Sequence, residues 1–301
     1  MENQPPQHVE GALAEPCGLC EEEGKESSAV TFPFYSYVKS FRTGLRECAK
    51  YYEVSDCDLN RYIQDSFPET DVVKKLVRCA LVNLAAWDDA SGVLDNVIRN
   101  YFHPVPEDTC YHNRTQDCIS KALGSCNSLD QFSKAYLSFQ CYFNQYGNLL
   151  TDEDRFIPYA PYEVQELAVN SLVIADLSQC VLKQHALGNI IDEPHFPSLL
   201  LAHYLHSVYY TSRDGIQLEI LYDQYGNKEL LTPETHQCVE AAQAAPGGSH
   251  HSDKLYRIFS RCLQHIVPTL QELQDGAASL IVDDQDCGCD VCTQTPFYNR
   301  V

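Results

Sequence analysis

Fifteen cysteines, spread from Cys17 to Cys292, are the residues of this 301-residue chain with the clearest chemistry. Thiols can form disulfides, bind zinc or act as redox centres, and the cellular compartment decides among these uses. Their spread along the chain is typical of disulfides formed in an oxidising compartment. We therefore expect a secreted, extracellular protein. The odd total leaves at least one thiol free or bonded to another chain, which would be a protein partner.

Two cysteine clusters near the chain ends could bind a metal ion or act in redox chemistry. The C-x-x-C motif Cys17–Cys20, together with Cys287, Cys289 and Cys292, could supply four thiolates to zinc. The second cluster lacks the regular spacing of a zinc knuckle, so we favour disulfides and predict no metal site. A thioredoxin-like redox use of the first motif would need a βαβ context, which the sequence does not provide.

Histidines are concentrated in the second half of the chain, where eight of the eleven follow residue 184. Because histidine titrates near neutral pH, they could form a switch that opens the second half in mildly acidic surroundings. We favour ordinary surface and core histidines, because no carboxylate partner can be assigned from sequence. The residues concerned include His185, His195, His203, His206, His250 and His251.

The composition excludes several classes of function. The 42 acidic and 21 basic residues give a net charge of −21, which repels nucleic-acid phosphates and anionic lipid and favours cationic partners. No run of 18 or more apolar residues occurs, so we predict no membrane insertion. The sequence also lacks the motifs of metalloproteases, α/β-hydrolases and phosphate-binding loops, and we predict neither an enzyme nor a cofactor.

Two further features bear on secretion. Asn113-Arg114-Thr115 is an acceptor sequon for N-glycosylation, which predicts a modified, surface-exposed Asn113. The first eleven residues, MENQPPQHVEG, contain no apolar core of a signal peptide, so we expect a mature chain that carries no leader.

The stretch from Phe132 to Asn148 has the helical pattern around which we expect the first half to be organised. Its apolar residues fall at i, i+3, i+4, i+7 and i+11, which lines up an aromatic stripe on one helix face. Cys141 lies beside that stripe, so a disulfide there would tether the helix to its neighbours. A second stretch, from Asp253 to Ile266, repeats the spacing around Cys262.

Further helical patterns precede each of these stretches, while strand-like alternation is scarce. Pro and Asp/Gly breaks separate the helices, and the order of elements recurs in the two halves. We therefore predict an all-α, internally duplicated chain. The other expected helices are Phe32–Tyr52, Asp58–Gln64, Val72–Ala86, Val93–Phe102, a stretch through Cys110, Cys118 and Cys126, Tyr162–Val181, Leu199–Tyr210, Ile216–Tyr225 and Pro233–Ala245.

Chain length and the positions of the breaks predict two domains. We expect a mobile N-terminal tail over residues 1–30 and a first domain over residues 31–150. The segment 151–161, rich in Asp, Glu and Pro, is the expected linker. A second domain would occupy residues 162–282, followed by a cysteine-rich C-terminal tail over residues 283–301.

The cysteine positions of the first half resemble those of the insect odorant-binding protein (PBP/GOBP-like) family, whose six cysteines pair one to three, two to five and four to six. Position three falls on Cys79 in LVRCALVNLAAWDD, and position six on Cys141 in FSKAYLSFQC. Lys75 and Phe132 take positions two and five, so both partners of one family disulfide are missing together. Losing one alone would leave a stray thiol, and the paired loss therefore supports the alignment.

The second half is similar to the same family pattern, with one further loss. Cys238 and Cys262 take positions four and six, whereas positions two, three and five carry no cysteine. Cys180, at position one, then lacks its family partner, and the cluster from Cys287 to Cys292 looks like the replacement. The resemblance covers roughly residues 31 to 280.

This resemblance implies two tandem six-helix domains that are stapled by disulfides. The family's two-domain members include the atypical double odorant-binding proteins of mosquitoes and the long salivary proteins of blood-feeding flies. Each bridge would stabilise the fold by about 2–4 kcal/mol. In the first half, Cys79 would pair with Cys48 or Cys57, and Cys141 with Cys118 or Cys126.

The resemblance also implies a secreted carrier or scavenger that encloses a small apolar or amphipathic ligand, such as an odorant, a lipid or a biogenic amine. Burial of the ligand's apolar area would supply the affinity. The competing interpretation is a structural or interaction protein whose interior is filled by side chains, which is the usual state of a buried aromatic residue. The residues that we expect to line the cavity are Leu76, Leu84, Trp87, Tyr136, Phe139, Phe143, Tyr204, Tyr222, Tyr256 and Phe259.

Overall fold

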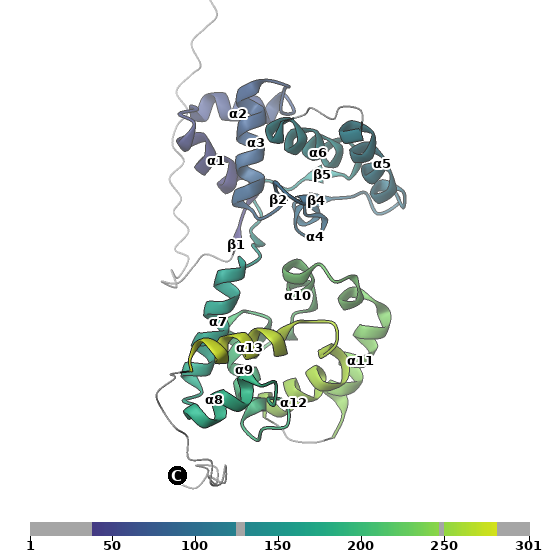
Figure 1. Cartoon of the computed structure of the whole chain (residues 1–301). Coiled ribbons are helices and arrows are strands. Elements are labelled where there is room, and N and C mark those ends of the chain that lie inside the picture. The colour runs from purple at the N-terminus through teal and green to yellow at the C-terminus, as the bar shows by residue number, and fades with distance from the viewer. Residues whose placement is uncertain (1–37, 125–129, 247–249, 282–301) are drawn as a thin grey trace, which may run out of the picture.

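The structure is a computed structural model that describes residues 38–124, 130–246 and 250–281. These residues form two helical bundles, which lie one above the other in Figure 1: the first bundle comprises α1 to α6 and the second comprises α7 to α13. The predicted all-α class is confirmed, because the described strands are each two residues long. None of the described helices is both long and apolar enough to cross a membrane. The predicted tails, residues 1–30 and 283–301, lie outside the described residues.

Polar N-caps begin several helices of the first bundle. The Ser40 side chain accepts a hydrogen bond from the backbone N–H of Thr43, and Asp130 accepts one from Ser133. Each cap satisfies an N–H that has no acceptor within the helix, and so fixes where the helix begins. The helices of this bundle are α1 (Phe41–Tyr51), α2 (Asp56–Gln64), α3 (Asp71–Asn83), α4 (Asp95–Ile98), the 3-10 helix η1 (Arg99–Tyr101), α5 (Tyr111–Gly124) and α6 (Gln131–Gln145).

Proline and glycine mark several helix ends in the second bundle. Pro161 and Pro233 stand at the first helical position, where a missing N–H breaks no intrahelical hydrogen bond. Gly226 ends α10 with a φ of +67°, a left-handed conformation that favours glycine. The helices are α7 (Pro161–Ile174), α8 (Gln179–Ala186), α9 (Phe196–His206), α10 (Leu218–Tyr225), the 3-10 helix η2 (Lys228–Leu231), α11 (Pro233–Ala244), α12 (His251–Ile258), the π-helical turn η3 (Phe259–Leu263) and α13 (Thr269–Ser279).

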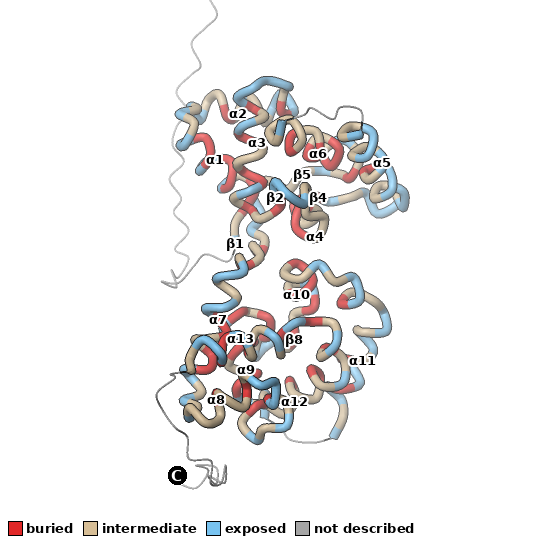
Figure 2. Tube along the Cα trace, in the orientation of Figure 1, coloured by how far each residue is buried: buried red, intermediate tan, exposed pale blue. Residues whose placement is uncertain are grey.

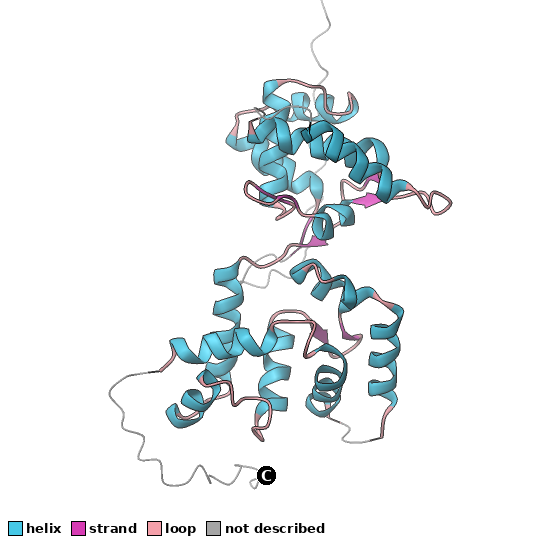
Figure 3. Cartoon of the chain, turned by 45° about the vertical axis from the view of Figure 1, so that its right-hand side comes forward, coloured by secondary structure: helices cyan, strands magenta, loops and turns pink. Residues whose placement is uncertain are grey.

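Short antiparallel ribbons join the helices (Figure 3). One of them has a particular role, because it pairs the strand that begins the first bundle with the segment that leads to the second. In it Val38 lies opposite Phe156, and Lys39 opposite Arg155. The four described ribbons are β1 (Val38–Lys39) with β6 (Arg155–Phe156), β2 (Trp87–Asp88) with β3 (Gly92–Val93), β4 (Phe102–His103) with β5 (Asn148–Leu149), and β7 (Tyr210–Thr211) with β8 (Gly215–Ile216).

Each bundle has its own hydrophobic core, and the two described clusters share no residue. In the first, the fully buried Phe139 ring stacks on Phe41 at a centroid distance of 5.6 Å and meets Phe67 edge-on at 5.0 Å. In the second, Tyr204 meets Phe259 edge-on at 6.2 Å. Figure 2 shows buried segments running through both bundles. Burial of this apolar surface is the main force that holds each bundle together.

Disulfides tie neighbouring helices within each bundle. For Cys79, whose partner the sequence left open, the structure selects Cys48, and for Cys141 it selects Cys118. Cys126 and the clusters Cys17–Cys20 and Cys287–Cys292 lie outside the described residues. Cys57 and Cys180 are half-buried. The described bridges are Cys48–Cys79 between α1 and α3, Cys118–Cys141 between α5 and α6, and Cys238–Cys262 between α11 and η3.

Some helix boundaries differ from the sequence predictions. The single helix expected over residues 162–181 is two helices, because Asp176 adopts a left-handed conformation with a φ of +49° and Ser178 caps the start of α8. The helix expected over residues 93–102 is only the short α4 followed by η1. The helix expected from residue 32 begins at Phe41, because the Ser40 cap and strand β1 precede it.

Candidate ligand pockets

The six cavity residues predicted in the first bundle form part of its packed core. Tyr136 donates its hydroxyl to the Phe67 carbonyl at 2.8 Å, which satisfies the polar end of an otherwise apolar side chain. Phe143 is partly buried and meets Phe67 edge-on at 5.7 Å. Neither of the two pockets described below is lined by any of these six residues. The other buried members are Leu76, Leu84, Trp87 and Phe139.

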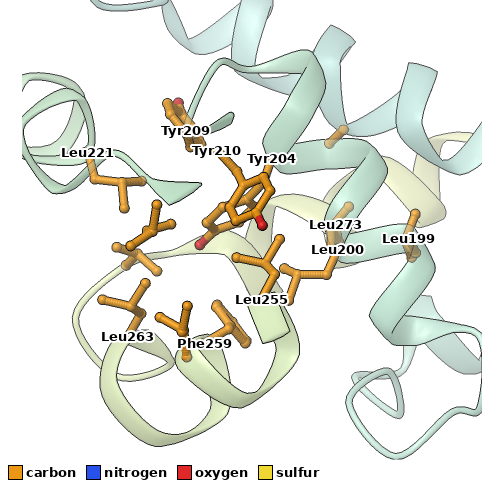
Figure 4. Close-up of a cluster of buried hydrophobic side chains, with 14 of the residues drawn as sticks. Leu199, Leu200, Tyr204, Tyr209, Tyr210, Leu221, Leu255, Phe259, Leu263 and Leu273 are labelled. Atoms are coloured by element: carbon orange, nitrogen blue, oxygen red, sulfur yellow. The ribbon is translucent and has the colours of Figure 1, made fainter. Parts of the chain in front are cut away.

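The cavity residues predicted in the second bundle are divided between its core and a pocket. Figure 4 shows Tyr204 and Phe259 among buried leucines of α9, α12 and α13. The Tyr204 hydroxyl is paired with Thr269 Oγ1 at 3.0 Å, and burial raises the pKa of this tyrosine above its usual range. Tyr256 is partly buried against the same core, whereas Tyr222 lines the second of the two pockets.

The larger pocket, which we call the α7–α13 pocket, has a volume of about 660 Å³. It lies between the start of α7, the end of α10 and α13. One wall is fixed by a reciprocal pair of hydrogen bonds: the Tyr159 N–H donates to Gln224 Oε1 at 2.8 Å, and Gln224 Nε2 donates to the Tyr159 carbonyl at 3.1 Å. Its lining residues are Tyr159, Pro161, Val164, Gln165, Gln224, Tyr225, Pro268, Glu272 and Asp275.

Glu272 connects this pocket to a buried polar chain in the second bundle. Its Oε2 accepts a hydrogen bond from the Tyr225 hydroxyl at 3.1 Å, and the buried His203 Nε2 lies 3.5 Å away. His203 Nδ1 in turn lies 3.4 Å from Ser171 Oγ. Burial raises the pKa of Tyr225 well above its usual value, so its hydroxyl keeps the proton that it donates to Glu272. The Tyr225 hydroxyl therefore fixes the position of the Glu272 carboxylate, which also lines the pocket.

The smaller pocket, which we call the interbundle pocket, has a volume of about 290 Å³ and is lined by residues of both bundles. The first bundle contributes residues from α4, η1, α5 and the C-cap of α6, and the second contributes residues from α10 and η2. The lining residues are Asp95, Arg99, Tyr111, His112, Tyr146, Tyr222, Lys228 and Leu231.

Direct contacts join the two bundles beside this smaller pocket. Asn96 Nδ2 donates to the Asp223 carbonyl at 2.7 Å, and the Arg99 guanidinium lies 4.2 Å from the centroid of the Tyr222 ring. Arg155, in the β6 strand that leads to the second bundle, donates from Nε to the Asn100 carbonyl at 2.9 Å. The Asp223 side chain is buried at this contact, and burial raises its carboxyl pKa to about 6. The contact between the bundles is therefore polar as well as aromatic.

Two histidines of the second bundle, the buried His185 and the half-buried His195, form a close pair. The Nε2 atoms of His185 and His195 lie 2.9 Å apart, so one ring donates a hydrogen bond to the other. Burial and the neighbouring ring lower the pKa of His185 to about 4, and burial also lowers the pKa of His195. The His185 ring is thus neutral in mild acid, where an ordinary histidine becomes charged.

The remaining predicted sites concern metal binding and glycosylation. Among the described residues, no group of three or more His, Cys, Asp or Glu side chains is arranged to hold a metal ion. The two terminal cysteine clusters considered for zinc lie outside those residues. Asn113 is exposed on α5, and its glycosylation stays a prediction.

The lining of the α7–α13 pocket was missed by sequence reasoning, because α13 was not predicted. The available signal was Pro268 followed by the acidic Glu272, a combination typical of a helix start. Gln224 and Tyr225 lie on a helix that was predicted, but periodicity does not show which of its residues face a pocket.

Comparison with known proteins finds a family to which the first bundle is similar. The profile of the PBP/GOBP family matches residues 36–145. General odorant-binding protein 69 of Anopheles gambiae is 27% identical over 140 residues, which cover 43% of this chain. They cover 58% of that relative, so the chain spans little more than half its length. No solved structure shows a significant match. The first bundle is therefore similar to the PBP/GOBP family over residues 36–145.

Proposed function

We propose that this protein is a secreted carrier or scavenger that binds a small amphipathic amine in the α7–α13 pocket. The match of the first bundle to the PBP/GOBP family profile and similarity to a protein named for odorant binding support a role in binding small molecules. The pocket volume of about 660 Å³ lies within the usual range for small-molecule sites, roughly 300–1,000 Å³.

The negative charge of the pocket lining is the observation from which we infer that the ligand is an amine. Two carboxylates, Glu272 and Asp275, line it, and no lysine or arginine does. The Glu272 side chain is only 11% exposed, so a bound ammonium group would interact with it at reduced dielectric, where charge–charge attraction is stronger than in water. The net charge of −21 adds a field that attracts cations toward the protein.

The remaining lining suits the apolar body of such a ligand. The Tyr159 and Tyr225 rings offer flat apolar faces that also attract a cation through their π electrons. Pro161, Val164 and Pro268 add further apolar surface. Tyr159 is held by its hydrogen bonds to Gln224, so this wall of the pocket is formed before a ligand arrives.

The two bundles also support the predicted division of the chain. We propose that they are the two domains expected over residues 31–150 and 162–282, with residues 151–161 as the linker. The separate hydrophobic cores support this division, since a domain is expected to have a core of its own.

The packing of the first bundle favours the competing function, a structural or interaction module, for that bundle. The side chains predicted to line its cavity lie in a core where fully buried aromatic rings contact one another. A bundle filled in this way would serve as a structural or interaction module, while the ligand is bound in the second bundle.

Isothermal titration calorimetry at pH 7.5 with 2-phenylethylamine and its uncharged analogue 2-phenylethanol tests the proposed function. We expect the amine to bind at least tenfold more tightly, because a charge-assisted hydrogen bond contributes about 1.5–3 kcal/mol. Glu272→Gln should remove this preference while keeping the size of the side chain and its acceptor for Tyr225. Asp275→Asn, at an exposed position, should weaken the preference without affecting the fold.

Glu240→Gln is the matched control, because Glu240 is an exposed carboxylate on α11 that does not line the pocket. It removes the same charge and should leave amine affinity unchanged. Equal affinity for the amine and the alcohol, or equal losses in Glu240→Gln and Glu272→Gln, would show that the pocket does not select a cation.

A further inference from the structure

The interbundle pocket has the opposite charge balance to the rest of the chain. Two permanent cations, Arg99 and Lys228, line it together with a single carboxylate, Asp95. The whole chain contains twice as many acidic residues as basic ones. A cation excess in a cleft of such a protein creates a local positive potential that selects anions.

Arg99 has hydrogen-bond donors that its protein neighbours do not use. Its Nε is buried and meets no acceptor among the described residues. Its Nη2 lies 3.6 Å from Glu219 Oε2, which is too long for a hydrogen bond. The Tyr222 ring covers one face of the guanidinium. A guanidinium stacked on a ring still presents its N–H edge, which is the geometry that binds a carboxylate with two parallel hydrogen bonds.

The one carboxylate of the pocket is already engaged. Asp95 Oδ1 accepts a hydrogen bond from the Tyr142 hydroxyl. Burial and the neighbouring carboxylate raise the pKa of Tyr142 above its usual range, so the tyrosine keeps its proton. Asp95 forms no ion pair with Arg99 or Lys228 among the described residues. Lys228 has no other ion-pair partner there, and Arg99 has only the long 3.6 Å contact with Glu219, so both cations can still take up an external anion.

We propose that the interbundle pocket binds a small amphipathic carboxylate, whose anionic group is held by Arg99 and Lys228. Its apolar body would lie against the rings of Tyr111, Tyr146 and Tyr222, which line the same pocket. The smaller volume, about 290 Å³, is at the lower end for ligand sites and restricts the guest to a single ring with a short chain. This site is separate from the α7–α13 pocket and prefers the opposite charge.

Binding at this site would also couple the two bundles. Arg99 belongs to the first bundle, and Lys228 and Tyr222 belong to the second. A ligand that contacts both favours the arrangement in which they lie together over any in which they separate. The bound ligand should therefore stabilise the contact between the bundles by mass action.

Isothermal titration calorimetry of the full chain at low salt with 4-phenylbutyrate and the uncharged 4-phenylbutyramide tests this inference. The carboxylate should bind at least tenfold more tightly than the amide. Lys228→Gln, at an exposed position, should lower carboxylate affinity several-fold without affecting folding, and Arg99→Gln should lower it further. Inorganic phosphate should bind more weakly than 4-phenylbutyrate, because it has no apolar body.

Lys50→Gln is the matched control, since Lys50 is exposed on α1 and does not line the pocket. It should leave carboxylate affinity unchanged. Lys228→Gln should leave the affinity for 2-phenylethylamine unchanged, which separates this site from the proposed amine site. The inference is overturned if the carboxylate does not bind, if carboxylate and amide bind equally, or if Lys228→Gln and Lys50→Gln have the same effect.

Discussion

Replacing Asp223 by asparagine should stabilise the protein near neutral pH. Asp223 lies at the contact between the bundles and is only 7% exposed. Its Oδ1 has no hydrogen-bond partner among the described residues. An ionised carboxylate in this place loses much of its hydration, and the Asn100 amide and the Arg99 charge offset the loss only in part. Asparagine has almost the same shape, keeps an acceptor for Asn100 and has no charge to desolvate.

The magnitude follows from the pKa of this carboxyl, which burial raises from 3.8 to about 6. Because the folded-state pKa is raised, the folded protein binds more protons than the unfolded chain between these values, and stability falls as pH rises through this window. A shift of about two pKa units corresponds to about 3 kcal/mol of unfolding free energy. The wild-type protein loses this stability as pH rises above 6 and regains it below pH 4. The stability difference between Asp223→Asn and wild type should therefore be up to about 3 kcal/mol more favourable to the variant at pH 7 than at low pH.

Urea unfolding at closely spaced pH values between 4 and 7.5 measures this effect. The difference in unfolding free energy between Asp223→Asn and wild type should grow with pH and level off above pH 6. Glu240→Gln removes an exposed carboxylate on α11 and should show no such dependence. A difference for Asp223→Asn that is the same at pH 4 and pH 7 would refute the argument from burial.

The other predictions concern the cores and bridges. Replacing Cys118 and Cys141 together by serine should lower the unfolding free energy by about 3 kcal/mol in urea, because the bridge closes a loop with a sequence separation of 23; an unchanged transition midpoint would show that α5 and α6 need no covalent tie. Phe139→Ala should cost about 3–5 kcal/mol in the same assay, since its ring is fully buried between Phe41 and Phe67. A loss below about 1 kcal/mol would indicate that the neighbouring side chains collapse into the space that the ring leaves.

The parts of the fold that sequence predicts are those set by local side-chain pattern. The apolar stripe over residues 132–148 corresponds to α6, and α3, capped by Thr70, begins at Asp71, one residue before the predicted start at Val72. These features arise within a few residues of one another. The break between α7 and α8 was missed because Leu177 and Val181 continue an apolar pattern across Asp176, whose left-handed backbone leaves no signal in periodicity.

The pockets could not be predicted in the same way. A pocket is the space that side chains leave unfilled, and that depends on the tertiary position of every neighbour. Tyr136 and Phe139 were expected to line a cavity because they lie on an apolar helix face, but such a face serves equally well as packed core. Glu272 and Gln224 come together only when α10 and α13 pack near the start of α7, which no sequence spacing shows.

The ribbon of β1 and β6 has a consequence for how this chain can be built and altered. Val38 and Phe156 are 118 positions apart in sequence but lie side by side, so the first bundle is entered and left at one point. A unit whose ends meet can be copied, removed or transplanted without stretching the rest of the polypeptide. Duplication within a single gene would need only a short spacer to yield two such units in tandem. The same geometry makes the first bundle a unit that could be grafted into another protein, although a graft that ends at Phe156 would expose a side chain that is buried here in the core of the second bundle.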